Sequence, residues 1–247
     1  MTLPARPDRF DRLDALRGLA MVWMTGFHLA FDLNQFHLIP RQHFYADPFW
    51  TLQRMAIVTL FLGCVGLSQA VAQAQQVESP RFWWRWARIA GGALLVSAGS
   101  ALMFPRSWIS FGVLHAVAVM LLIVRGLRGL RLPDWGWIAL GVGVFAVASR
   151  VSHPLFDARW TNWLGLTTRK PITEDYVPLL PWFGAVAVAM GVGQWLLRSR
   201  PALLQGGLPA ALQPLARLGR WSLPYYLLHQ PVLIGLVMAW TYCAPNL

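Results

Sequence analysis

The stretch LQRMAIVTLFLGCVGLSQAVA, residues 52–72, decides the fold class of this chain. Arg54 near its start is its only charged residue, and it contains no proline. About 20 apolar residues suffice for an α-helix to cross the hydrocarbon core of a bilayer, because each residue adds about 1.5 Å along the axis. The stretch therefore predicts a transmembrane helix.

Six more apolar segments of similar character follow one another along the 247 residues. The composition agrees with a membrane protein, since 56% of residues are hydrophobic and 13% are charged, against about 25% charged in soluble domains. We therefore expect one all-α domain, 1–247, folded as a polytopic membrane helix bundle. Its seven transmembrane helices are predicted at about 14–33, 52–72, 84–103, 108–124, 135–150, 177–197 and 221–242.

The net charge of +11 comes from 21 Lys and Arg against 10 Asp and Glu. A nucleic-acid-binding protein carries such residues on a solvated face, whereas here they lie between apolar segments, so no nucleic-acid partner is expected. Alternate connections carry 14 basic residues, including Arg6 and Arg9, on one side and 7 on the other. Because basic residues favour the cytoplasmic side, the N-terminus is predicted inside and the C-terminus outside.

Histidine and aspartate occur within the first apolar segment, where ionisable groups are costly and usually functional. His28 and Asp32 are spaced i, i+4, so they share one helix face. A carboxylate in this position can hold an imidazole in one tautomer and raise its basicity, as a general base requires. His28 is therefore the predicted catalytic base, oriented by Asp32.

Two other apolar segments also carry a histidine. His115 is predicted at a depth similar to that of His28, so the two are expected to line one outer cavity. His229 lies between Pro224 and Pro231, which interrupt the helical hydrogen bonds around it. Carbonyls freed in this way are typical of a cavity wall, although a simple kink explains them equally well.

The outer ends of two other segments place polar residues near the same predicted cavity. Arg54 lies at the start of one helix, and Asp175 and Tyr176 come just before another. The connection 151–176 is unusually long, as functional loops often are. Its Trp160 is one of several tryptophans that lie beside polar residues, a mixture that suits a sugar ligand.

Several motifs in chain order resemble the membrane acyltransferases, and more closely the bacterial relatives of the heparan-alpha-glucosaminide N-acetyltransferase catalytic domain. Ten residues separate Arg17 from His28, as in the superfamily's arginine–histidine signature. The matching segments are RFDRLDALRGLA at 9–20, FLGCVG at 61–66, FGVLH at 111–115, DYVPLLPW at 175–182 and HQP at 229–231.

This resemblance implies a multi-pass enzyme of the bacterial cytoplasmic (inner) membrane. It would move an acetyl group from cytosolic acetyl-CoA to a sugar amine or hydroxyl outside, with no metal. The lysosomal enzyme carries asparagine where His28 falls and a histidine further on, which makes His37 the reserve candidate for the base. The acceptor, the acyl group and the oligomeric state, a homodimer included, stay open.

The predicted roles follow the chemistry of acyl transfer. Arginine binds phosphate in a bidentate manner, so the predicted ligands of the CoA phosphates are Arg17, Arg217 and Arg220. The pantetheine arm is predicted to pass His229. His115 or Arg54 would stabilise the oxyanion. Direct transfer and a ping-pong route through acetylated His28 are both compatible with the sequence.

Two other functions compete with acetyl transfer. A proton-coupled transporter or flippase would use His28 and Asp32 as a proton relay. A haem-binding electron carrier would use His28 and His115 as axial ligands. A retinal protein is disfavoured because Lys170, the only lysine, lies in an outer connection.

Overall fold

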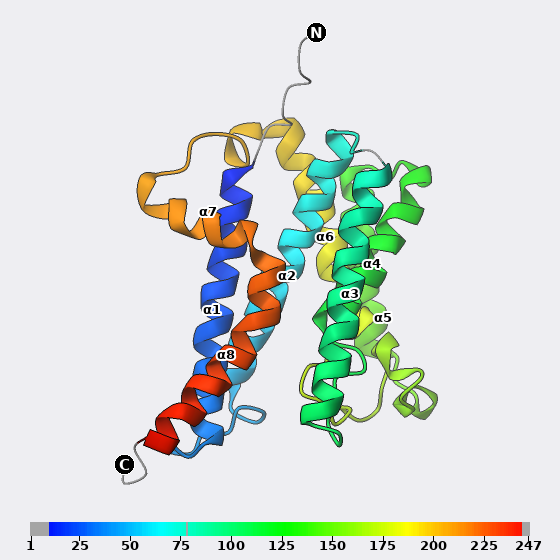
Figure 1. Cartoon of the computed structure of the whole chain (residues 1–247). Helices are drawn as coiled ribbons and strands as arrows, with labels where there is room; N and C mark the ends of the chain where they lie inside the picture. Colours follow the sequence, from blue (N-terminus) through cyan, green and yellow to red (C-terminus); the bar gives the residue numbers. More distant parts are fainter. Residues whose placement is uncertain (1–9, 78, 244–247) are drawn as a thin grey trace. The chain divides into compact units, whose positions relative to one another are not determined.

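The computed structural model describes residues 10–77 and 79–243, and these contain helices and connections but no strand. Arg6 and Arg9, which were counted among the basic residues of the predicted cytoplasmic side, lie outside the described residues. Each of the seven predicted apolar segments forms a long helix, which confirms the all-α fold class (Figure 1). The long helices are α1 (Asp11–Gln35), α2 (Pro48–Ala74), α3 (Ser79–Met103), α4 (Val113–Leu127), α5 (Asp134–Arg150), α6 (Leu179–Ser199) and α8 (Ser222–Cys243).

Five helices of the described chain are long and apolar enough to cross a membrane, namely α2, α3, α4 with the turn after it, α6 and α8. The first helix, α1, is long enough but carries charged residues such as Asp14, Arg17 and Asp32. The fifth, α5, has 17 residues, fewer than the roughly 20 that a bilayer needs. The chain is therefore a multi-pass membrane protein, while the count of seven spans and the orientation stay predictions.

The predicted start of the fourth helix is wrong by five residues, because α4 begins at Val113 rather than at 108. Gly112 has extended backbone angles and is the N-cap. The N–H of Val113 donates to Asp175 Oδ2 at 2.8 Å, and the N–H of Ile109 donates to Ser100 Oγ at 2.9 Å. Side chains from distant segments thus satisfy the backbone here and replace the helical pattern expected from the apolar run.

The connection before the last long helix also differs from the prediction, since it contains a short helix, α7 (Gln213–Arg220). A Cβ atom on Gly18 would lie 1.9 Å from the carbonyl oxygen of Leu215, and one on Gly219 would lie 1.8 Å from that of Asp14. The two glycines thus allow the backbones of α1 and α7 to touch. This contact holds α7 against α1, and the sequence analysis did not include this short helix.

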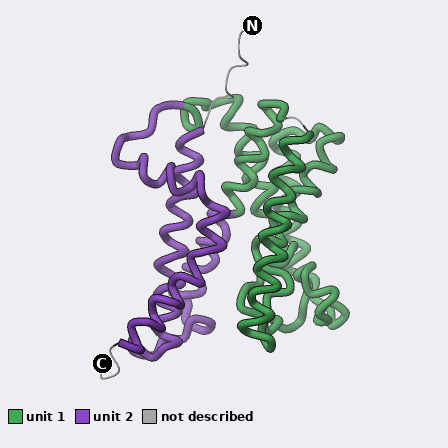
Figure 2. Tube along the Cα trace, viewed as in Figure 1, with its two compact units in different colours: residues 1–9, 62–205 green, residues 10–61, 206–247 purple. Residues whose placement is uncertain are grey.

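The described chain divides into two compact units (Figure 2). Among the described residues, the α1/α8 unit comprises 10–61 and 206–243, and it contains α1, α7, α8 and the first half of α2. The α3–α6 unit comprises residues 62–205. Each unit is described below by itself.

The core of the α1/α8 unit lies where α1, α2 and α8 pack together. Met21, Met24 and Ile57 are buried there, and Phe61 and Tyr226 pack around them. A hydrogen bond also joins two of the helices, because the hydroxyls of Thr25 and Tyr225 lie 2.6 Å apart. The unit therefore brings the middle of α1 against the first turns of α8.

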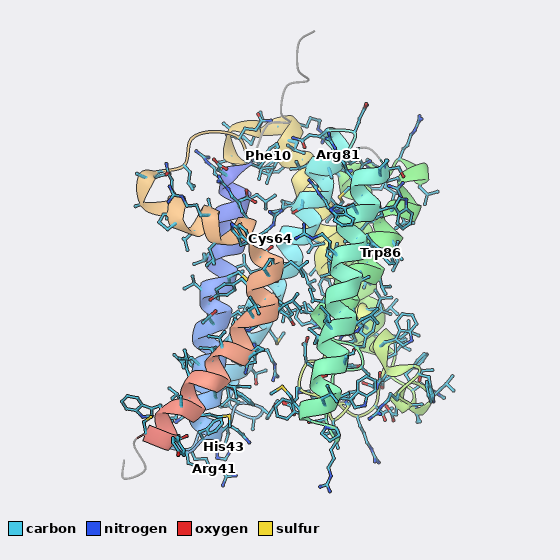
Figure 3. The ribbon with its side chains drawn as sticks, viewed as in Figure 1. Phe10, Arg41, His43, Cys64, Arg81 and Trp86 are labelled. Atoms are coloured by element: carbon cyan, nitrogen blue, oxygen red, sulfur yellow. The ribbon has the colours of Figure 1, made fainter. Side chains whose placement is uncertain are left out.

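The α3–α6 unit is built on close helix contacts at small residues. A Cβ atom on Gly141 of α5 would lie 2.7 Å from the carbonyl oxygen of Gly184 of α6, and one on Gly66 of α2 would lie 2.3 Å from that of Val186. Trp86 on α3, labelled in Figure 3, donates from Nε1 to the carbonyl of Ala118 on α4 at 2.9 Å. These contacts pack α6 against α2 and α5, and α4 against α3.

Candidate functional site

A polar cluster lies between α1 and α8, in the α1/α8 unit. It consists of His28, Asp32, His229 and Gln230, which we call the α1/α8 cluster. The ring centroids of His28 and His229 are 5.2 Å apart, and Gln230 Nε2 donates to Asp32 Oδ1 at 2.9 Å. Asp32 is 4% exposed and His229 is 9% exposed. Four polar side chains from two distant segments thus meet inside an apolar unit.

The tautomer of His229 follows from its backbone contact. Its Nδ1 lies 2.7 Å from the carbonyl oxygen of Tyr226, and a carbonyl only accepts, so Nδ1 carries the hydrogen. In the neutral ring, Nε2 then holds a lone pair. Tyr225 stacks on the same ring with centroids 6.1 Å apart. The imidazole is therefore fixed in both orientation and tautomer.

Three buried polar atoms of the cluster have no hydrogen-bond partner among the described residues. They are Asp32 Oδ2, His229 Nε2 and Gln230 Oε1. All three accept hydrogen bonds in the states described, and buried polar groups are normally paired. The cluster is therefore suited to groups that donate hydrogen bonds, such as amines, hydroxyls or an imidazolium.

The predicted contact between His28 and Asp32 is not observed. No hydrogen bond joins them among the described residues, and Asp32 Oδ1 instead accepts from the amide of Gln230 on the facing helix. The i, i+4 spacing places two side chains on one face, but a partner on a packed helix competes for the carboxylate. The sequence analysis missed Gln230, although it stands next to His229 in the HQP segment, and the catalytic roles of the pair stay predictions.

Two further predicted residues belong to the same unit. The guanidinium carbon of Arg54 lies 5.6 Å from the ring centroid of Tyr45, as in a cation–π contact. His37 follows α1 in a left-handed backbone conformation with φ of 59°, and its side chain is exposed. The reserve histidine thus lies in a turn after α1, whereas His28 lies on the packed part of the helix.

His115 belongs to the α3–α6 unit, where both of its ring nitrogens have partners. Nδ1 accepts from the N–H of Gly112 at 3.2 Å, and Nε2 lies 3.1 Å from Ser97 Oγ. The Ser97 hydroxyl in turn donates to the carbonyl of Ile109 at 2.6 Å. His115 therefore secures the start of α4, and its predicted position beside His28 stays a prediction.

Asp175 and Tyr176 are also engaged within the α3–α6 unit. Asp175 Oδ2 accepts from the N–H of Val113 at 2.8 Å, which adds a negative charge at the N-terminus of α4. The Tyr176 hydroxyl donates to the carbonyl of Asn162 at 2.7 Å, and burial raises the pKa of that hydroxyl. Both residues anchor the connection 151–176 to the helices.

The three predicted phosphate-binding arginines occupy different settings around α7. Arg17 is paired with Asp14 at 2.6 Å, and Arg220 is paired with Asp11 at 2.8 Å. Arg217 is exposed and has no ion pair with a described residue. A pocket of about 390 Å³ lies here, lined by Asp11, Gly207, Leu208, Gln213, Ala216, Arg217 and Arg220.

Comparison with known proteins gives one family. The family described as "Heparan-alpha-glucosaminide N-acetyltransferase, catalytic" matches residues 9–231. No similar curated protein and no similar solved structure was found. The match covers most of both units, including the whole α1/α8 cluster and α7 with its pocket.

Proposed function

The chain belongs to the heparan-alpha-glucosaminide N-acetyltransferase catalytic family, and from that premise we propose that it is a membrane acetyltransferase. The donor is acetyl-CoA from the cytosol, and the acceptor is an amine or hydroxyl of a sugar on the other side of the membrane. The proposed location is a bacterial inner membrane, with the N-terminus in the cytoplasm. Family membership and the α1/α8 cluster support this proposal.

The α1/α8 cluster is the observation that carries the proposal. Acyl transfer requires a group that takes a proton from the acceptor while its nitrogen or oxygen attacks the thioester carbonyl. His28 has no hydrogen bond to a described residue, so the ring nitrogen that carries no hydrogen is available for that task. His28 is partly buried between α1 and α8, and exclusion of water from such a site would strengthen each polar contact.

In the proposed reaction, the acceptor atom bonds to the carbonyl carbon and the carbon–sulfur bond breaks. The acceptor's proton passes to His28 and then to the CoA thiolate. Arg54, on α2 of the same unit, is the proposed donor to the oxyanion, because its guanidinium contacts the Tyr45 ring and has no ion pair with a described residue. Asp32 supplies the one carboxylate of the cluster and favours positive charge near it.

The pocket beside α7 is the proposed site of the CoA phosphates. It has room for a phosphate group, and Arg217 lines it without an ion pair to a described residue. Arg17 is paired with Asp14 within α1, whereas the pair of Arg220 with Asp11 joins α7 to α1, and both arginines add to the local positive charge. Arg217 is the proposed direct ligand.

The test is acetyl transfer by the purified full chain in nanodiscs. Acetyl-CoA labelled in the acetyl group is supplied with a panel of amino sugars and their hydroxyl analogues. We expect labelled product from the unchanged protein and from His153→Ala, an exposed histidine of the other unit. Folded protein that binds acetyl-CoA but neither hydrolyses it nor transfers its acetyl group to any acceptor would contradict the proposal.

A further inference from the structure

We infer that His229 is the hydrogen-bond partner of His28 during acetyl transfer, the role that the sequence analysis assigned to Asp32. This inference rests on the proposed function, because it concerns the same reaction. It is carried by three observations on the α1/α8 cluster: the short distance between the two rings, the fixed tautomer of His229, and the hydrogen bond that Asp32 Oδ1 accepts from Gln230, the residue after His229.

The first observation is the arrangement of the rings. The centroids of His28 and His229 are 5.2 Å apart with an interplanar angle of 61°. At this separation, nitrogens on facing ring edges can reach hydrogen-bond distance by side-chain rotation alone. His28 has no other hydrogen bond to a described residue that would oppose such a rotation.

The second observation is that His229 presents an acceptor and no donor at its free edge. Nδ1–H is bound to the carbonyl of Tyr226 at 2.7 Å. Nε2 is buried and has no partner among the described residues. Tyr225 stacks nearly parallel to the ring and restricts its rotation. A ring held in this way accepts a hydrogen bond at Nε2 without a change of tautomer.

The third observation concerns Asp32, the only carboxylate of the cluster. One of its oxygens receives the Gln230 amide at 2.9 Å. Because Gln230 follows His229 directly on α8, this bond ties the carboxylate to the backbone turn that carries the second histidine. Asp32 thus fixes α8 against α1 and sets the position of His229 opposite His28.

The chemical step follows from these positions. One nitrogen of His28 takes the proton of the acceptor as the new bond to the carbonyl carbon forms. The imidazolium then carries a hydrogen on each nitrogen, and the second one donates to Nε2 of His229. When the carbon–sulfur bond breaks, His28 returns its first proton to the CoA thiolate. His229 stabilises the charged intermediate state without taking part in a covalent bond, so it is a positioning residue.

The experiment compares two substitutions at one position. His229→Phe keeps an aromatic ring against Tyr225 but removes the acceptor, and we expect kcat to fall about 10-fold to 100-fold, as for other orienting partners. The KM for acetyl-CoA should stay unchanged. His229→Gln restores an acceptor oxygen and should recover most of the activity. His153→Phe makes the same exchange at an exposed site of the other unit and serves as the matched control.

A double-substitution cycle separates this role from simple packing. If His229 acts through His28, the loss caused by His229→Phe should disappear in a His28→Ala background. If the losses of kcat in the two single variants multiply in the double variant, the inference is overturned. Unchanged kcat in folded His229→Phe would overturn it as well, and both outcomes would leave the proposed function intact. Absence of transfer by the unchanged protein would instead overturn the proposed function.

A spectroscopic measurement tests the pairing without any turnover. In full-length protein with ¹⁵N-labelled histidine, His229 should show the Nδ1–H tautomer, and the His28 signals should shift in His229→Gln. An Nε2–H tautomer for His229, or unchanged His28 signals, would overturn the inference. This test needs no folded His229→Phe protein.

Discussion

The two units of the molecule each contain a histidine on an apolar helix, yet they treat it in opposite ways. In the α3–α6 unit, both ring nitrogens of His115 have partners that secure the start of α4. In the α1/α8 unit, His28 has no hydrogen bond to a described residue, and Nε2 of its neighbour His229 is buried without one. A histidine with all its partners supplied by the fold is suited to structure, and one without them is suited to chemistry.

The largest effect that this comparison predicts is at His28. His28→Ala should lower kcat by about 10²–10⁴-fold, because a general base contributes that much and alanine accepts no proton. The protein should remain folded and still bind acetyl-CoA. The measurement is single-turnover acetyl transfer together with a binding titration. Normal turnover by folded His28→Ala would refute the assignment and make His37→Ala the next variant to examine.

Arg217→Ala should have a smaller effect and of a different kind. We expect the KM for acetyl-CoA to rise about 10-fold to 100-fold with kcat unchanged, because losing one charge-assisted contact costs roughly 1.5–3 kcal/mol and acts on binding alone. Steady-state kinetics measure the two constants separately. Arg200→Ala removes a basic residue that does not line the pocket and serves as the matched control. An equal loss in both variants would show a general charge effect.

Substitution of His115 tests the other half of the comparison. His115→Ala should lower the thermal midpoint, because the N–H of Gly112 and the hydroxyl of Ser97 lose their partner at a cost of about 1–3 kcal/mol. The kcat of the protein that remains folded should be retained. A large fall in kcat with an unchanged midpoint would give His115 the role in the oxyanion step that the sequence analysis suggested.

The sequence predicts the long helices well, because apolar length and composition decide them. It fails where one segment depends on another far along the chain. The start of α4 depends on Asp175, and α7 packs against α1 where Gly18 and Gly219 admit a close backbone contact. Which distant residue satisfies the start of α4, and which face of α1 receives α7, cannot be found in either segment alone.

The candidate site shows the same division. His28 and His229 are visible in the sequence as polar residues in apolar runs, because burying them is costly wherever they fold. Their mutual contact is not visible, since nothing in either segment specifies the register of α1 against α8. The bond between Asp32 and Gln230 is invisible for the same reason, because the local i, i+4 rule considers only residues of the same helix.

The smallest predicted effect concerns Asp157, in the connection 151–176 of the α3–α6 unit. Its side chain accepts from the hydroxyl of Thr168 and, at 2.7 Å, from the N–H of the same residue. These hydrogen bonds lower the pKa of Asp157, and the bond from the Thr168 hydroxyl contributes most. Because the pKa is lowered in the folded state, these bonds stabilise the connection fully at pH values above the ordinary carboxyl pKa of about 4. The stabilisation is lost as the pH falls through the lowered pKa.

Asp157→Asn should therefore loosen this connection at neutral pH while leaving the α1/α8 cluster as it is. The measurement is amide hydrogen exchange at Thr168 and Arg169, whose N–H groups both point at this carboxylate. We expect faster exchange in the variant at pH 7, and in the unchanged protein a comparable opening only under acid conditions, after correction for the intrinsic pH dependence of exchange. The thermal midpoint should hardly move, because the side chain is exposed and solvent weakens the contact. Unchanged exchange at both amides would show that other contacts, such as the bond from Tyr176 to Asn162, are enough to hold the connection.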